Sequence, residues 1–367
     1  MNKQSFADLG VLPVLTEALA GRGIDSAFAV QQLVIPDVLA GHDVLAQSPT
    51  GSGKTLAFGI PLIQRLARHP HLHAGLVLAP TRELALQIVD ELEPLAKTCG
   101  LKVAAVYGGV GFGPQIAKAR KANIIVACPG RLEDLITRGD VRLGDVETLV
   151  LDEADRMLDM GFKPAVERIV KRTPAKRQTL LFSATLEGAV GKLANSLTRK
   201  ARSHEHRPPR KDTTIVHRFV PVMHEAKLDT LVHELRADDR GRTLVFVRTK
   251  RGADRLVKRL RARGAEAVAI HGDKSQSQRE KALQRFHAGH TDTLVATDVA
   301  ARGIDVDAIT HVINFDPPAD RDTYVHRIGR TGRAGSTGIG ITFVMHDQAA
   351  EMHKIARDLG LQSDQIR

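Results

Sequence analysis

The sequence predicts an α/β protein of two domains, each a mostly parallel β-sheet flanked by helices, joined by a short basic linker. Three observations predict this class. Ten short apolar, β-branched runs recur along the chain, each run ends in a cluster of polar residues, and a helix-like amphipathic stretch follows. Continuous apolar runs that alternate with amphipathic stretches are typical of buried parallel strands in β-α-β units. A chain of 367 residues is long enough for two such domains.

The expected strands form two series of five. They are residues 43–48, 76–80, 123–129, 148–155 and 178–185, and then 242–249, 267–273, 292–298, 311–316 and 339–345. Among the helices, residues 254–264 show the helical spacing of apolar positions surrounded by basic ones. Gly100 and Gly264 stand where glycine caps are expected at helix ends.

Residues 199–212 separate the two series. They hold six basic residues, two prolines and no apolar residue larger than Ala. Such a composition cannot pack into a core and predicts a linker. We therefore expect a first domain at residues 1–200, a linker at 201–213 and a second domain at 214–367.

Composition excludes several classes of protein. The net charge of +11 is spread over both halves and favours a polyanionic partner, although a generally basic surface would also produce it. Aromatic residues make up only 4%, so a nucleic acid would be held by its backbone rather than by base stacking. No apolar run approaches the roughly 18 residues of a membrane span, and no secretory signal begins the chain. Cys99 and Cys128 are too few for a disulfide framework or a four-cysteine zinc site.

Residues 48–55, Ser-Pro-Thr-Gly-Ser-Gly-Lys-Thr, follow an expected strand and begin a helix. Their backbone N–H groups would surround phosphate oxygens, helped by the positive end of the following helix. Lys54 would reach the β- and γ-phosphates, and the Thr55 hydroxyl would bind Mg²⁺. Ser48 stands where the usual motif has its first glycine. The placement between strand and helix favours a nucleotide site over a flexible loop.

Residues 152–155, Asp-Glu-Ala-Asp, follow another expected strand. The Asp152 carboxylate suits Mg²⁺ binding, and Glu153 suits the activation of a water molecule. Taken alone, a solvated acidic turn would explain the tetrapeptide equally well. The phosphate-binding pattern upstream favours the metal site.

In order and spacing, these motifs resemble the DEAD-box family of ATP-dependent RNA helicases over essentially the whole chain. Further matching segments are residues 80–84, 108–109, 129–131, 183–185, 245–247, 301–305 and 326–333, the last reading His-Arg-Ile-Gly-Arg-Thr-Gly-Arg, together with Phe6, Gln31, Gln276, Arg279 and Thr297. The resemblance implies two RecA-like domains that close on ATP, Mg²⁺ and RNA. It makes the first the ATP-binding domain, with an N-terminal Q-motif, and the second the helicase C-terminal domain.

The resemblance also implies roles at the nucleotide site. Gln31 would read the adenine edge, since its amide offers a donor and an acceptor side by side. Asp305 would bind the ribose. The remaining nucleotide contacts are Phe6, Ser48, Pro49, Thr50, Gly51, Ser52, Gly53, Lys54, Thr55 and Gly303. Thr55 and Asp152 would hold Mg²⁺, partly through water.

The implied catalytic residues are Lys54, Asp152, Glu153, Arg330 and Arg333. Arg330 and Arg333 would be arginine fingers supplied by the second domain, although an exposed basic loop on nucleic acid would also explain them. A planar, always charged guanidinium can neutralise the charge that develops on a transferred phosphoryl group. Ser183, Ala184 and Thr185 would couple the nucleotide site to strand separation.

RNA would contact both domains through hydroxyls, guanidiniums and glycine backbone. The implied contacts are Pro80, Thr81, Arg82, Gly109, Gly130, Arg131, Thr249, Gly272, Gln276, Arg279 and Thr297. None of them reads a base edge, so recognition would be independent of RNA sequence.

The chain departs from the family pattern in three places. Residues 27–30 are Ala-Phe-Ala-Val where the family usually has Pro-Thr-Pro-Ile, with Ile24 where an aromatic residue is usual. Cys128 replaces the usual Thr before residues 129–131, and Ser48-Pro49 precede Thr50 where small residues such as Ala are usual. None of these changes removes a group with a direct catalytic role.

We therefore expect RNA-stimulated ATP hydrolysis coupled to local, non-sequence-specific unwinding of short RNA duplexes or remodelling of ribonucleoproteins. The protein would act as a cytoplasmic monomer, with ribosomal or RNA-decay proteins as candidate partners and no membrane association. Two alternatives use many of the same motifs. One is an ATP-gated RNA clamp or scaffold with little unwinding, and the other is a DNA-directed helicase or translocase.

Overall fold

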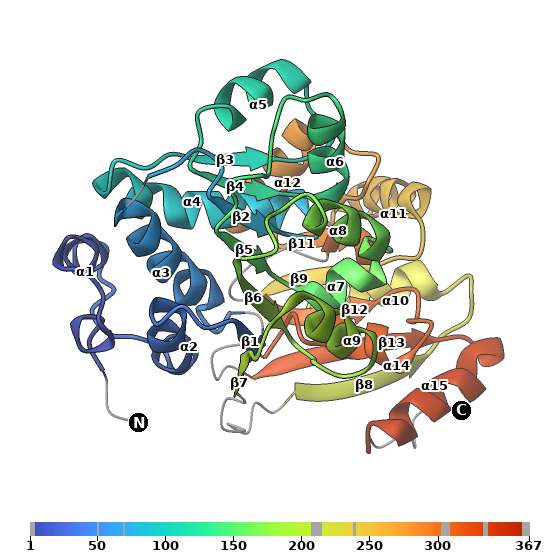
Figure 1. Ribbon diagram of the computed structural model, residues 1–367. Helices are drawn as coiled ribbons and strands as arrows, with labels where there is room; N and C mark the ends of the chain where they lie inside the picture. The colour runs from blue at the N-terminus through green and yellow to red at the C-terminus, as the bar shows by residue number, and fades with distance from the viewer. Residues whose placement is uncertain are drawn as a thin grey trace. The chain divides into compact units, whose positions relative to one another are not determined.

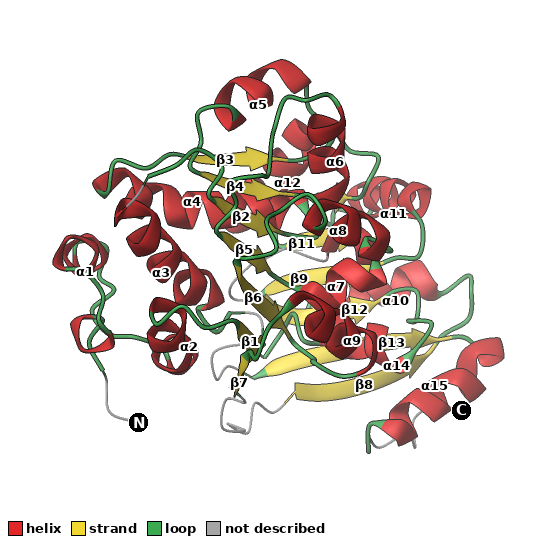
Figure 2. Cartoon of the chain, in the orientation of Figure 1, coloured by secondary structure: helices red, strands yellow, loops and turns green. Residues whose placement is uncertain are grey.

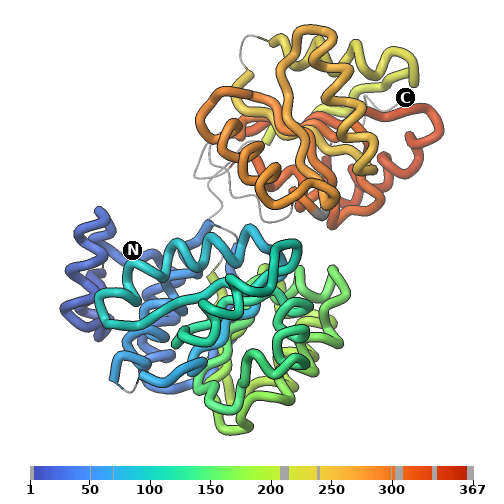
Figure 3. Tube along the Cα trace, turned by 90° about the horizontal axis from the view of Figure 1, so that it is seen from above, coloured from blue at the N-terminus to red at the C-terminus, as the bar shows by residue number. Residues whose placement is uncertain are grey.

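In the computed structural model the chain divides into two compact units, Met1–Pro208 and Pro209–Arg367 (Figures 1 and 3). The structure describes residues 4–49, 51–68, 70–206, 215–237, 240–301, 309–332 and 337–361. Each unit is a parallel sheet with helices packed on it, so the expected α/β class is confirmed (Figure 2).

The first unit contains a seven-stranded parallel sheet in the order β3-β4-β2-β5-β6-β1-β7. Its strands are β1 (Val44–Gln47), β2 (Gly75–Leu78), β3 (Val103–Val106), β4 (Ile124–Ala127), β5 (Thr148–Leu151), β6 (Gln178–Ser183) and β7 (Arg202–Glu205). Its helices are η1 (Ala7–Leu9), α1 (Pro13–Ala20), α2 (Ala29–Leu39), α3 (Lys54–Arg68), α4 (Arg82–Thr98), α5 (Phe112–Ala119), α6 (Pro129–Thr137), α7 (Ala154–Asp159), α8 (Lys163–Val170) and α9 (Gly188–Leu197).

Strand β6 shows why the central strands read as continuous apolar runs. Leu180 and Phe182 belong to one hydrophobic core, and Leu181, between them, belongs to the other. Successive side chains of a strand point to opposite faces, so a strand covered on both faces must be apolar at every position. Phe182 also packs against Phe58 of α3, with ring centroids 5.3 Å apart. This double covering places the polar residues of each strand at its ends.

The second unit contains a six-stranded parallel sheet in the order β10-β11-β9-β12-β13-β8. Its strands are β8 (Ile215–Pro221), β9 (Arg242–Phe246), β10 (Val268–Ile270), β11 (Thr293–Ala296), β12 (Ile309–Asn314) and β13 (Gly338–Val344). Its helices are α10 (Lys227–Glu234), α11 (Lys250–Ala262), α12 (Gln276–His287), α13 (Asp298–Ala301), α14 (Arg321–Ile328), η2 (His346–Gln348) and α15 (Ala349–Asp358).

The predicted helix at residues 254–264 corresponds to α11, which begins four residues earlier, at Lys250. Gly100 and Gly264 both follow helix ends with φ of 70° and 76°, the left-handed conformation that glycine adopts without strain.

The predicted linker at residues 201–213 begins too early. Arg202–Glu205 forms β7, which pairs with β1 at the edge of the first sheet. The Arg202 N–H donates to the Asp43 carbonyl oxygen at 2.8 Å, and the His206 N–H donates to the Gln47 carbonyl oxygen at 2.9 Å. An edge strand can be held by such backbone pairing while its side chains stay in water, so its sequence need not be apolar. Residues 207–213 lie outside the described part of the chain.

No helix in the described ranges combines the length and apolarity needed to cross a bilayer. Cys99 and Cys128 are both free thiols.

Candidate active site

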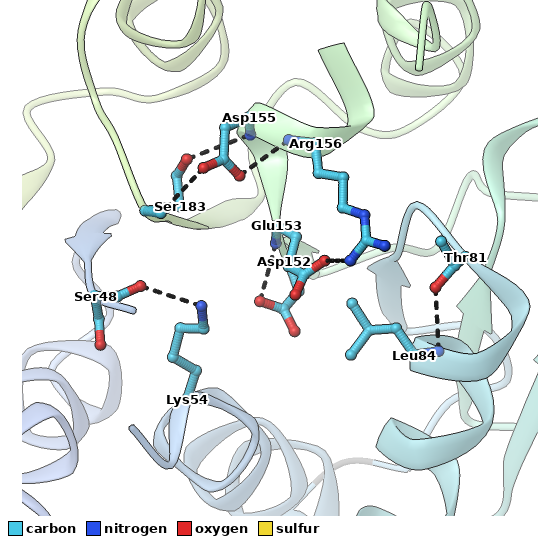
Figure 4. Close-up of polar contacts among 10 residues, drawn as sticks. Ser48, Lys54, Thr81, Leu84, Asp152, Glu153, Asp155, Arg156 and Ser183 are labelled. Carbon is cyan, nitrogen blue, oxygen red and sulfur yellow. Dashed lines mark hydrogen bonds and ion pairs between the residues drawn. The ribbon is translucent and has the colours of Figure 1, made fainter. Parts of the chain in front are cut away.

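Three segments singled out in the sequence meet at the carboxyl edge of the first sheet. Strands β5, β6 and β1 are neighbours, and Gln47 pairs with Ser183 while Leu151 pairs with Leu181. Residues 48–55, 152–155 and 183–185 therefore leave the sheet side by side (Figure 4). In open parallel sheets, this edge is where ligands bind.

The loop of residues 48–53 folds back toward the sheet. The Ser48 N–H donates to the Ser183 carbonyl oxygen at 2.9 Å, and the Ser48 and Ser52 hydroxyl oxygens are 2.5 Å apart. Gly51 and Gly53 have φ of 78° and 88°, where a side chain would be strained. The two glycines therefore allow the chain to turn just before Lys54. Thr50 lies outside the described residues.

Lys54 is buried where α3 begins. Its Nζ donates to the Ser48 carbonyl oxygen at 3.2 Å (Figure 4). The Asp152 carboxyl, also buried, accepts a 3.0 Å hydrogen bond from the Glu153 N–H. Burial raises the pKa of Asp152 to about 6, and the positive charge of Lys54 opposes that rise. An ammonium and a carboxyl of this kind suit a phosphate and its metal ion.

Glu153 is held in a constrained position. Its φ and ψ of 52° and 54° lie in the left-handed region, which is costly for a residue other than glycine. Arg156 Nη1 donates to Glu153 Oε2 at 2.5 Å, and both side chains are buried. Arg156 was not among the predicted site residues, although its position three residues after Glu153, on α7, is a usual spacing for an ion pair. The pair fixes the direction of the Glu153 carboxylate.

Asp155 connects the acidic segment to residues 183–185. Its N–H donates to Ser183 Oγ at 3.3 Å, and its Oδ2 accepts from the Ala184 N–H at 3.0 Å. The Thr185 N–H approaches Ser183 Oγ at 3.4 Å. A shift of either segment must therefore strain or break hydrogen bonds to the other.

Asp152→Asn is expected to stabilise the first unit in a pH-dependent way. A pKa raised from about 4 to about 6 means that ionised Asp152 costs the native state up to about 3 kcal/mol above pH 6. In the wild type, the stabilisation that the native state gains from protonated Asp152 is fully present below pH 4 and is lost as pH rises through 6. The variant does not titrate here, and its Oδ1 still accepts from the Glu153 N–H.

The measurement is the unfolding midpoint of the nucleotide-free protein across that pH range. The variant should exceed the wild type above pH 6, and the gap should close as pH falls toward 4. A difference in unfolding midpoint that did not change with pH would contradict a raised pKa of Asp152 in the native state.

Gln31 and Phe6, two residues expected to contact the nucleotide, lie in different surroundings. Gln31 is buried; its Nε2 donates to the Gly53 carbonyl oxygen at 3.0 Å and its Oε1 accepts from the Phe28 N–H at 2.7 Å. Gln31 thus ties α2 to the phosphate-binding loop. Phe6, expected as a nucleotide contact, is only 3% exposed and packs in the core, so its ring faces no open site.

Phe28 is the aromatic ring that the sequence analysis missed near Gln31. It is 61% exposed, and a Cβ on Gly53 would lie 2.7 Å from its Cδ2. The ring therefore lies against the phosphate-binding loop and also faces solvent. The sequence did contain a signal for this ring: Phe28 stands three residues before Gln31, where the family usually has Thr.

Two predicted RNA-binding arginines of the first unit contact one loop, residues 107–111. A Cβ on Gly109 would overlap the Arg82 guanidinium. Arg131 Nη1 donates to the Val110 carbonyl oxygen at 3.0 Å, and its guanidinium lies 4.2 Å from the Phe112 ring centre. The structure thus brings Arg82, Gly109 and Arg131 together.

The other predicted contacts in this unit surround the starts of α4 and α6. Thr81 Oγ1 accepts from the Leu84 N–H at 3.3 Å and caps α4 (Figure 4). Pro80 is buried, and Gly130 is exposed with open space around its Cα. Burial raises the pKa of Cys128, the residue before α6, to about 12, so this thiol stays protonated.

The predicted RNA contacts of the second unit lie where helices follow strands. Thr249 caps α11, since its Oγ1 accepts from the Gly252 N–H at 3.0 Å. Gln276 begins α12 and donates to Glu280 Oε1 at 3.0 Å. Gly272 is exposed, whereas Arg279 and Thr297 are largely buried.

Arg327 organises the segment that contains Arg330. Its guanidinium donates to both Asp298 carboxylate oxygens, at 2.5 and 2.8 Å, and to Asn314 Oδ1 at 3.0 Å. Arg330 follows α14, is 9% exposed, and lines a small pocket with Phe246, Asp298 and His326. Arg327 belongs to the matching segment 326–333 but was not among the predicted site residues. Gly303, Asp305 and Arg333 lie outside the described residues.

The residues expected to hold Mg²⁺ are oxygen donors, which this ion prefers. No group of three or more His, Cys, Asp or Glu side chains within the described ranges could hold a metal ion alone. Mg²⁺ in nucleotide sites is usually bound by one or two protein oxygens, with phosphates and water completing the shell. Thr55 and the buried Asp152 fit that pattern.

Each of the two units matches the sequence model of a known protein family. The DEAD/DEAH box helicase model matches residues 28–193, and the helicase conserved C-terminal domain model matches residues 226–335. The chain is 42% identical to the ATP-dependent RNA helicase CshA of Limosilactobacillus reuteri over 355 residues, 96% of this chain and 71% of that protein. It is 41% identical to the DEAD-box ATP-dependent RNA helicase CshA of Bacillus subtilis over 366 residues, 99% of this chain and 74% of that protein.

Solved structures of DEAD-box proteins are also similar to this chain over nearly its whole length. Dbp5 of S. cerevisiae bound to RNA and ADP BeF3 has a TM-score of 0.84 and 30% identity, covering 97% of this chain and 93% of that one. A DEAD box protein from the hyperthermophile Methanococcus jannaschii has a TM-score of 0.55 and 38% identity, covering 98% of each chain. The two parallel-sheet units thus match the RecA-like domains expected from the sequence.

Proposed function

The chain belongs to the DEAD-box family of ATP-dependent RNA helicases, and from that premise we propose RNA-stimulated ATP hydrolysis coupled to local, non-sequence-specific separation of short RNA duplexes or remodelling of ribonucleoproteins. The observation that carries the proposal is the meeting of residues 48–55, 152–155 and 183–185 at one sheet edge. This edge joins phosphate-binding, water-activating and coupling groups in one hydrogen-bonded unit.

The chain's own residues divide the work at the nucleotide. The loop N–H groups and Lys54 bind the phosphates, and the constrained Glu153 carboxylate accepts a proton from the attacking water. Mg²⁺, when held by Thr55 and Asp152, supplies charge neutralisation on the phosphates. Arg330 and Arg333 stabilise the charge that develops on the γ-phosphoryl group.

RNA is held by its backbone. The cluster of Arg82, Gly109 and Arg131 offers two guanidiniums to phosphate oxygens, and the missing side chain of Gly109 makes room for the Arg82 guanidinium. Asp155 donates to Ser183 and accepts from Ala184, and these two hydrogen bonds support coupling of RNA separation to ATP turnover.

The test is steady-state ATP hydrolysis without nucleic acid, with single-stranded RNA, and with DNA of the same sequence, at one low salt concentration. Stimulation by RNA alone is expected. Equal stimulation by DNA would support a DNA-directed helicase instead. Slow turnover with long-lived RNA complexes would favour the clamp alternative.

Phe28→Ala is expected to weaken ATP binding. We infer that the exposed ring beside Gly53 and Gln31 covers one face of the adenine. Stacking of a base on an aromatic ring contributes about 1–3 kcal/mol, so the Kd for ATP should rise at least about 5-fold.

The control is Leu72→Ala, which removes another exposed apolar side chain of the same unit. Titration with a fluorescent ATP analogue measures both variants. Unchanged affinity in Phe28→Ala would exclude the ring from the base site.

A further inference from the structure

A groove in the second unit lies outside the sites described above. It runs between α11 and α12, both of which contact β10. Its lining residues are Asp254, Val257, Lys258, Arg261, Val268, Ala269, Lys274, Gln278, Lys281, Ala282 and Arg285. We call it the α11–α12 groove.

The groove is strongly basic. Five of its lining side chains are cationic, and Asp254 is its single carboxylate. That carboxylate is already paired with Lys274 at 2.8 Å and faces His271 at 3.0 Å. Glu266 lies 4.0 Å from both Arg261 and Arg285, which is the limit of an ion pair. The groove therefore keeps an excess of positive charge.

Lys258 and Lys281 contribute the charge that is least compensated. Both are exposed, and neither has an ion-pair partner within the described ranges. They lie on different helices, Lys258 on α11 and Lys281 on α12, so they reach the groove from its two sides. Two unpaired ammonium groups facing one groove fit a polyanion.

The floor of the groove is the open edge of the sheet. Among the strands that the structure describes, β10 pairs with β11 alone, and it contributes Val268 and Ala269 to the lining. An unpaired strand edge could also accept a peptide strand. However, β10 has only three residues, so the cationic walls are the larger feature and favour a ligand with repeated negative charges.

One end of the groove lies near a proposed RNA contact, because Lys274, which lines the groove, follows Gly272 by two residues. Gln276 and Arg279, on the first turn of α12, lie on a different side of that helix from Gln278, Lys281 and Arg285, which line the groove. Thr249 caps α11, whose lining residues begin at Asp254. From Gln278 to Arg285 the helix rises by about 10 Å at 1.5 Å per residue, which extends the basic surface away from those contacts.

We propose that the α11–α12 groove binds the backbone phosphates of an RNA segment that extends beyond the nucleotides held at Thr249, Gln276 and Arg279. The inference rests on the proposed function, because it takes RNA as the ligand. It adds a second RNA-binding surface that senses RNA length without reading sequence. Lysines contact phosphates as point charges, so such binding is strongly dependent on salt.

The test compares the double variant Lys258→Ala/Lys281→Ala with the wild type on two RNAs. One is the shortest RNA that stimulates ATP hydrolysis, and the other is the same RNA extended at either end. Fluorescence anisotropy with a non-hydrolysable ATP analogue measures Kd at several salt concentrations. Lys354→Ala, an exposed lysine on α15, is the matched control.

For the extended RNA, the variant should bind more weakly. The plot of the log association constant against log salt should become shallower: the magnitude of its negative slope should fall by about 1.4, or about 0.7 per lost phosphate contact on a single strand. Binding of the short RNA, and the ATP hydrolysis it stimulates, should stay at wild-type values. Lys354→Ala should change none of these.

Three outcomes would overturn the inference. They are an unchanged salt slope on the extended RNA, an equal loss on both RNAs, and a wild type that gains no affinity from the extension. The last would leave the groove to an acidic protein partner. Failure of the short RNA to stimulate wild-type hydrolysis would instead contradict the proposed function, so the two failures can be told apart.

Discussion

Replacing Glu153 with glutamine is expected to lower RNA-stimulated ATP turnover by about 10²–10⁴-fold, the usual contribution of a general base. Binding of ATP and RNA should persist. Gln has nearly the same shape and still offers an oxygen to Arg156, which now donates to Glu153 Oε2 at 2.5 Å. What it loses is the capacity to accept a proton from the attacking water.

The measurement separates kcat from binding. Steady-state hydrolysis with saturating RNA gives kcat, and titration with a fluorescent ATP analogue gives the affinity. Glu167→Gln, which removes an exposed carboxylate on α8, should behave as the wild type. If Glu153→Gln turned over ATP at the wild-type rate, Glu153 would have no role in proton transfer.

The interior of both sheets could be predicted from sequence, and the sheet edges were harder. All ten predicted strands exist, and the three that were missed, β3, β7 and β8, each lie at the edge of a sheet. In β3, buried positions alternate with half-buried ones; β8 has one buried residue, Phe219, and β7 has none. A search for continuous apolar runs detects strands covered on both faces, and an edge strand in water need not have such a run.

The position of the site could be predicted for the same reason. Polar residues that follow buried parallel strands must meet at one edge, which places Ser48, Asp152 and Ser183 together. Contacts that depend on side-chain direction could not be predicted. The Arg82 guanidinium over Gly109 and the Phe28 ring against Gly53 require the loops to be folded first. The burial of Phe6 in the core could not be predicted either, because it depends on how the N-terminal segment packs.

Arg333→Ala is expected to reduce kcat by about 10³–10⁵-fold, the range reported for removal of an arginine finger. The affinity for ATP should change little, because the phosphate-binding loop and Lys54 belong to the first unit. Arg333→Lys should remain slow, since an ammonium keeps the charge but loses the planar array of donors. Steady-state kinetics with saturating RNA, and nucleotide titration, measure the two effects separately.

Arg321→Ala is the control, because Arg321 is an exposed arginine on α14 of the same unit. Arg330→Ala is a less clean variant, since Arg330 is largely buried in a pocket beside Asp298. A large loss of kcat in Arg333→Ala without loss of ATP affinity would mean that the second unit acts on the transition state and not on nucleotide binding. Hydrolysis would then depend on the two units coming together around one nucleotide. An unchanged kcat would leave charge neutralisation to Lys54 and the metal ion, and would make the second unit an RNA-binding element only.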